Sequence, residues 1–205
     1  MGARSGGGGA GSGGFGRGDG WFSGDVTGVE TLKNIQDKKL YNATKETISR
    51  FYKELGIPQR NAKLANLPDN VAGVHVTANG KTDGVYLNKK MFKNGTVQSV
   101  NKQMQTAYKT GFLTKTNKPV AHTLTHELAH SVWNAHMTGG KQKAAGKEVM
   151  NVYRQWKADR KKSGYGKYAS TNVSEFWSET ITKGMHGKAD KYTKALKGIA
   201  KKYQL

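Results

Sequence analysis

The residues best suited to chemistry lie at positions 126–130, where the chain reads His126-Glu127-Leu128-Ala129-His130. Two histidines four positions apart share one face of a helix, so both imidazoles can reach the same metal ion. The glutamate between them projects beside that pair, where it can take a proton from a metal-bound water. The pattern predicts a metal site with His126 and His130 as ligands and Glu127 as general base. The alternative is an ordinary amphipathic helix that carries two histidines by chance.

A catalytic zinc needs three protein ligands and an open position, so four other histidines compete for the third place. His122 lies four residues before His126 without a glutamate directly after it, and we place it either in the hydrogen-bonding surroundings of the site or on the helix surface. His136 ends an H-E-x-x-H-x-x-G-x-x-H pattern in which a tryptophan replaces the glycine that turns the chain. If the helix continues, His136 points about 120° away from the metal face, which leaves it a runner-up. The spacing of His75 and His186 supports neither as a ligand.

Two glutamates fit better than these histidines. Glu175 and Glu179 are four apart on a helix that Asn172 is suited to cap, so they share a face. We predict Glu175 as the third ligand and Glu179 as an acceptor that orients a ligating imidazole. The local alternatives are a capping box between Asn172 and Glu175 and an ion pair between Glu179 and Lys183.

Residues 165–179 read YGKYASTNVSEFWSE and, together with HELAH, resemble the zincin metalloprotease core of the anthrax lethal factor and Pro-Pro endopeptidase family. Zincin-like domains encoded by bacteriophages share this core. In that family a tyrosine precedes the third ligand by seven residues, and an aromatic pair and a second acid follow the ligand. Tyr168, Glu175 and Glu179 match these positions, whereas Ala129 stands where the family usually has glycine. The shared motifs cover about 30 residues.

The resemblance implies peptide hydrolysis with one catalytic Zn²⁺ held by His126, His130 and Glu175. It implies that Glu127 activates the water and that Tyr168 donates a hydrogen bond to the oxyanion. It also implies that the peptide substrate adds as a strand to a sheet edge near the active helix, for which residues 84–88 are our candidate.

The elements that position these residues are mostly helical. Apolar spacing predicts helices near 29–35, over 48–55, 97–110, 120–137, 143–162 and 173–183, and a lysine-rich helix at the end of the chain. Residues 71–77 and 84–88 are rich in β-formers and predict two adjacent strands. We therefore expect an α+β, mainly helical zincin-like fold with a small sheet.

The domain organisation follows from composition. Residues 1–26 are glycine-rich and predict a flexible tail, and 27–205 form a single domain. Within it we expect N-terminal helices over 27–68, a catalytic core over 70–187 and a C-terminal helix over 188–205.

Composition and charge constrain the partners. The chain has 205 residues and a formal charge of +20. It contains no cysteine, which excludes disulfides and thiolate chemistry. No apolar stretch predicts a membrane span or a secretory signal, so we expect no membrane partner and favour the cytoplasm of a bacterial host or a phage virion. The lysine excess permits nonspecific polyanion contact, and the alternative function is a basic virion or nucleic-acid-associated structural protein. A delivered toxin is a third possibility, without an export signal or a delivery domain to support it.

Overall fold

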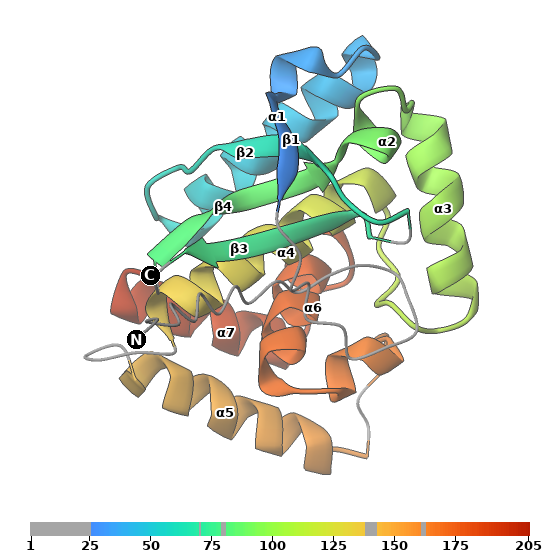
Figure 1. Ribbon diagram of the computed structural model, residues 1–205. Coiled ribbons are helices and arrows are strands. Elements are labelled where there is room, and N and C mark those ends of the chain that lie inside the picture. Colours follow the sequence, from blue (N-terminus) through green and yellow to red (C-terminus); the bar gives the residue numbers. More distant parts are fainter. Residues whose placement is uncertain (1–25, 70, 79–80, 138–142, 161–162) are drawn as a thin grey trace, which may run out of the picture.

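The computed structural model describes residues 26–69, 71–78, 81–137, 143–160 and 163–205. A four-stranded sheet of mixed direction packs against a larger set of helices, which confirms the α+β class (Figure 1). The predicted glycine-rich tail lies outside the described residues except for its last position. Among the helices described, none combines the length and apolar character needed to cross a bilayer.

The elements follow one another in a simple order along the chain. The strands are β1 (Thr27–Thr31), β2 (Ala62–Asn66), β3 (Gly73–Ala78) and β4 (Lys81–Asn88). The α-helices are α1 (Lys38–Leu55), α2 (Lys89–Phe92), α3 (Val97–Lys109), α4 (Pro119–His136), α5 (Lys143–Ala158), α6 (Val173–His186) and α7 (Lys191–Tyr203). Two short 3-10 helices, η1 (Leu32–Asn34) and η3 (Lys167–Ser170), complete the set. Six of these helices match regions that apolar spacing predicts.

The sheet has the strand order β1-β2-β4-β3, so β1 and β3 form its edges. Strand β4 pairs with β3 in the antiparallel sense and with β2 in the parallel sense. The prediction that residues 84–88 form a free edge is therefore wrong, because both sides of β4 are already hydrogen-bonded. The free edge beside the helices that carry the motifs belongs to β3.

The expected helix near residues 29–35 is also wrong. Residues 27–31 form β1, which pairs with β2, and only one 3-10 turn follows. Residues 27–68 therefore contain two strands as well as helix α1. Apolar spacing of three residues fits a short strand followed by a turn as well as it fits a helix, and pairing with β2 decides the outcome.

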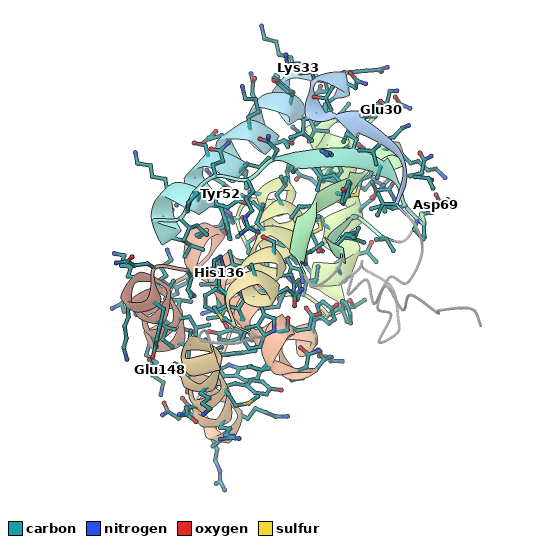
Figure 2. The ribbon with its side chains drawn as sticks, turned by 60° about the vertical axis from the view of Figure 1, so that its left-hand side comes forward. Glu30, Lys33, Tyr52, Asp69, His136 and Glu148 are labelled. Carbon is teal, nitrogen blue, oxygen red and sulfur yellow. The ribbon has the colours of Figure 1, made fainter. Side chains whose placement is uncertain are left out.

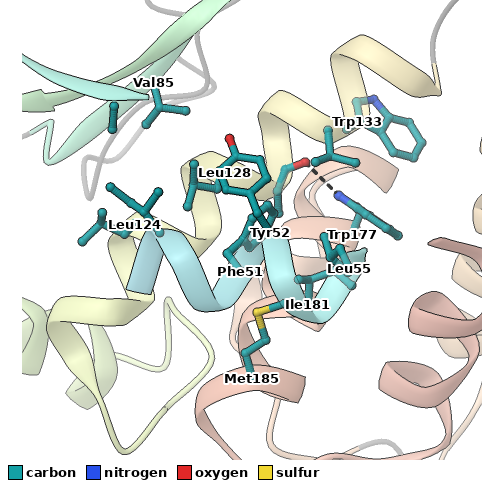
Figure 3. Close-up of a cluster of buried hydrophobic side chains, with 14 of the residues drawn as sticks. Phe51, Tyr52, Leu55, Val85, Leu124, Leu128, Trp133, Trp177, Ile181 and Met185 are labelled. Atoms are coloured by element: carbon teal, nitrogen blue, oxygen red, sulfur yellow. Dashed lines mark hydrogen bonds between the residues drawn. The ribbon is translucent and has the colours of Figure 1, made fainter. Parts of the chain in front are cut away.

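Helix α4 lies at the centre of the molecule and positions the predicted metal ligands. Every residue from Val120 to Trp133 is buried, between the sheet, α1 and α6. Figure 3 shows its apolar side chains packed among those of the neighbouring elements, including Leu124 and Leu128 of α4, Phe51 and Leu55 of α1, Val85 of the sheet, and Trp177 and Ile181 of α6. A helix that is buried all round is held by its neighbours, so the side chains on it have little freedom to move.

Helix α6 runs against α4 and begins at a side-chain cap. The side-chain Oδ1 of Asn172 accepts a hydrogen bond of 2.9 Å from the backbone N–H of Glu175. The indole N–H of Trp177 donates to the backbone oxygen of Ala129 at 2.9 Å, which joins the two helices beside the predicted site (Figure 3). The cap fixes where α6 starts and the indole bond fixes its position along α4.

Candidate metal centre

Three side chains from α4 and α6 converge on one point in the interior. The Nε2 atoms of His126 and His130 lie 3.1 Å apart, and each is within 3.2 Å of Oε2 of Glu175. All three residues are buried. Helix α4 supplies the two imidazoles one turn apart, and the first turn of α6 supplies the carboxylate.

The spacing of these donor atoms fits a metal ion. Metal bonds of about 2.0–2.1 Å in a tetrahedron place neighbouring ligand atoms about 3.3 Å apart. The observed separations of 3.1–3.2 Å are close to that edge length. Two imidazoles and one carboxylate also form the donor set that zinc accepts in open, catalytic sites. The cluster can therefore hold a metal ion with one position left over.

Each imidazole also has an oxygen close to its second nitrogen. Nδ1 of His130 lies 2.9 Å from the hydroxyl of Ser174, and Nδ1 of His126 lies 3.0 Å from Oε1 of Glu179. The other oxygen of Glu179 accepts a 2.7 Å hydrogen bond from the backbone N–H of Thr114. An oxygen behind each ring favours the tautomer with its proton on Nδ1, which leaves the Nε2 lone pair free for a metal.

The local alternatives for the two glutamates do not form. Asn172 caps α6, but the side chain of Glu175 turns to the histidines. Lys183 does not pair with Glu179, because its ammonium group donates to Asp190 at 2.7 Å and to a backbone oxygen. Both carboxylates therefore face the cluster as the sequence predicts.

The second half of the chain, residues 101–205, has six acidic residues, and three of them lie outside this centre. Glu148, Asp159 and Asp190 each pair with a lysine, and Glu148 lies at the periphery in Figure 2. Glu127, Glu175 and Glu179 are buried, and the last two lie against the histidines. Three of these six acids therefore pair with lysine, and the other three lie at one centre.

Glu127 lies between the cluster and the edge strand. It is buried, and a Cβ atom built on Gly73 of β3 would stand 3.0 Å from its Cγ. Glu127 also lines a small cavity that it shares with His126 and Tyr168. The absence of a side chain at Gly73 therefore allows the edge strand to approach the predicted general base.

Tyr168 reaches the same cavity from η3. Its ring stacks on His126 with centroids 5.7 Å apart and on Phe112 at 4.8 Å, and its backbone N–H donates to the oxygen of Phe112. Burial, together with the carboxylates of Glu175 and Glu127, raises the pKa of Tyr168. The phenol therefore keeps its proton at neutral pH and can act as a donor.

Opposing influences set the protonation of the metal-free cluster. Burial disfavours a charged His126, but Glu175 and Glu179 outweigh burial and raise its pKa well above the usual value. Burial likewise disfavours a charged Glu175, and His130 and His126 outweigh it and lower the pKa of that carboxyl. Burial lowers the pKa of His130. Without a metal, His126 is therefore protonated on both ring nitrogens. A metal ion that binds Nε2 has to displace the proton from that nitrogen.

The other histidines do not join the ligand triangle. Helix α4 continues to His136, which lies on its last turn and outside both His/Glu groups able to hold a metal among the described residues (Figure 2). Nε2 of His186 lies 2.7 Å from the hydroxyl of Thr125, and His75 is buried in β3 with neither ring nitrogen hydrogen-bonded. His122 is buried beside Glu179.

Two contributors were missed by sequence reasoning. Ser174 directly precedes Glu175, so simple helix periodicity places it off the face that Glu175 and Glu179 share. The backbone N–H of Thr114 belongs to a loop 65 residues before Glu179. Neither carries a sequence signal, because one depends on the crossing of α4 and α6 and the other on a loop contact.

Comparison with known proteins yields no match: neither a protein-family model, nor a curated protein, nor a solved structure is similar to this chain at a significant level.

Proposed function

We propose that this chain is a zinc-dependent metalloendopeptidase with a zincin-type fold. The observation that carries the proposal is a buried His126–His130–Glu175 ligand triangle beside a small cavity that His126 shares with Glu127 and Tyr168. A structural metal site would enclose the ion with four protein ligands, whereas three ligands beside an acid–base pair fit a hydrolytic site. The motif resemblance supports the same conclusion.

In this proposal each residue of the centre has a separate role in peptide hydrolysis. Zinc, when bound, supplies Lewis acidity that makes a water acidic and polarises the peptide carbonyl. The carboxylate of Glu127 accepts the proton of the attacking water and passes it to the leaving amine. The phenol of Tyr168 donates a hydrogen bond to the oxyanion as negative charge develops there. Glu179 and Ser174 hold the imidazole rings of His126 and His130 in place.

The edge of β3 is the place where a peptide substrate fits. The backbone oxygen of Ala72 accepts a bond from the N–H of Asn88, so the backbone groups of Ala72 and Val74 face β4. In an antiparallel pair the alternate residues Gly73 and His75 then direct their N–H and C=O groups to the free side. A peptide added there as a strand would run past Glu127, which touches the edge at Gly73.

The test is metal analysis and peptide cleavage with the full chain. Purified protein is expected to contain about one zinc per chain, held by the His126–His130–Glu175 triangle. It should cleave members of a peptide library, and a chelator should abolish cleavage until zinc is restored. Stoichiometric zinc without cleavage of any library peptide would contradict the proposal.

A further inference from the structure

His122 is fully buried, although the ligand triangle does not include it. It lies one helical turn before His126, and the two rings are nearly parallel, with centroids 6.1 Å apart and an interplanar angle of 11°. The ring of Tyr108 packs edge-on against it at 5.6 Å. The packing around a histidine enclosed in this way holds its ring in one plane.

One oxygen of Glu179 lies between two imidazoles. Oε1 of Glu179 is 3.0 Å from Nδ1 of His126 and 3.4 Å from Nε2 of His122. Its other oxygen already accepts the backbone N–H of Thr114 at 2.7 Å. Neither nitrogen of His122 makes a hydrogen bond of regular geometry among the described residues, and the same is true of Nδ1 of His126 and Oε1 of Glu179, so these buried polar atoms approach one another without another partner there. The shared oxygen of Glu179 is therefore the acceptor available to His122.

These three residues have the composition of a second metal site, but a hydrogen-bonded group fits the chemistry better. Nδ1 of His126 has to carry a proton when Nε2 binds a metal, unless the ring becomes a doubly deprotonated bridge. That proton then points at Glu179 and closes the position to a second ion. If Nε2 of His122 also carries a proton, Oε1 of Glu179 faces two N–H donors, one from each imidazole.

We propose that His122 is a positioning residue for the metal ligand His126 and acts through Glu179. Its Nε2–H restrains the carboxylate that fixes the tautomer and the ring orientation of His126. The inference rests on the proposed metal site and adds to it a residue that is not itself a ligand. A buried carboxylate held on both oxygens moves less, which keeps the ligand triangle at metal-binding distances.

The experiment compares His122→Gln with His122→Met in the full chain. The two replacements have similar size and flexibility, and only glutamine keeps an N–H donor near the position of Nε2. Zinc affinity is measured by competition with a chelator, without peptide substrate, and the visible spectrum of the cobalt form reports ligand geometry. We expect His122→Met to weaken zinc binding about tenfold and shift the cobalt spectrum, and His122→Gln to stay within about threefold of wild type. Equal affinity of all three proteins, or equal loss in both variants, would overturn the proposal.

Two further measurements separate positioning from space filling. In a Glu179→Gln background, the effect of His122→Met on zinc affinity should largely vanish, because the two residues act in series. In the wild-type protein, nitrogen-15 NMR of the imidazoles should show His122 protonated on Nε2, and protonation on Nδ1 would contradict the assignment even if a variant failed to fold. Binding of two zinc ions per chain would also overturn it. Zinc binding without peptide cleavage would refute the peptidase alone, whereas a wild-type protein that binds no zinc would refute both.

Discussion

Replacement of Gly73 by alanine tests whether the edge strand and the general base fit as closely as the structure indicates. The new Cβ would lie 3.0 Å from Cγ of Glu127 and 3.3 Å from the backbone oxygen of Tyr86. Carbon atoms in contact normally stand about 3.5–4.0 Å apart. Because the backbone of β3 is tied to β4, we expect the side chain of Glu127 to move away by about 0.5 Å.

The magnitude follows from that displacement. A misplacement of about 1 Å at a reacting group costs up to about 100-fold in rate, so half that distance predicts about a tenfold fall in kcat. Crowding in a packed region should also lower the free energy of unfolding by about 1 kcal/mol. Zinc content should not change, because Glu127 is not a ligand.

Gly84 supplies the matched control on the neighbouring strand. A Cβ at Gly84 would have its nearest neighbours at 3.9 Å, which is ordinary contact distance. Gly84→Ala should therefore leave kcat near the wild-type value. The assay is the steady-state cleavage of a library-derived peptide by both variants, with zinc content and urea unfolding measured in parallel. A Gly73→Ala variant with wild-type kcat, or an equal loss in Gly84→Ala, would refute the close approach of strand and base.

Three other substitutions probe the remaining parts of the centre. Tyr168→Phe should lower kcat/KM about 100- to 1,000-fold with zinc affinity unchanged, because the oxyanion loses a hydrogen-bond donor. Tyr165→Phe serves as the control. A Tyr168→Phe rate within twofold of wild type would exclude Tyr168 as the oxyanion donor. Ser174→Ala should weaken zinc binding about tenfold in a chelator competition, because Nδ1 of His130 loses its acceptor, and unchanged affinity would show that the hydroxyl does not orient the ring. Burial, followed by the charge of His130, lowers the pKa of His75 from 6.5 to about 4, so the stability due to its neutral ring is complete above pH 6.5 and is lost as the pH falls toward 4. We therefore expect the free energy of unfolding of the metal-free wild-type protein, measured in urea, to fall by about 2.5 kcal/mol more between pH 7 and pH 4.5 than that of His75→Leu. Equal losses in the two proteins would contradict the burial of a neutral imidazole.

Six of the helices, and the faces that α4 and α6 present, were predictable from the sequence. The i, i+4 spacing in α4 and α6 defines which side chains share a face, and the cap at Asn172 fixes the start of α6. These relations are local, so they survive any tertiary arrangement. The structure brings His126 and Glu175 within 3.2 Å, as the third-ligand prediction requires.

The arrangement of the sheet was not predictable in the same way. The sequence predicts a helix where β1 forms, predicts no strand at β2, and places an edge at β4 although β2 pairs with its other side. Strand pairing depends on contacts between distant residues, which the alternation of side chains within one strand does not encode. The parts of the site that escaped prediction, Ser174 and the N–H of Thr114, also depend on such distant contacts.

The central claim is that Glu127 acts as the base at a zinc site that hydrolyses peptides. The most direct measurement is kcat/KM for one peptide with wild-type protein and with Glu127→Gln, both at one zinc per chain. The glutamine keeps the size and the metal ligands but cannot accept a proton at neutral pH. Loss of the general base predicts a fall of at least about 100-fold with zinc affinity unchanged. A Glu127→Gln protein that binds zinc and cleaves the peptide at the wild-type rate would contradict the claim.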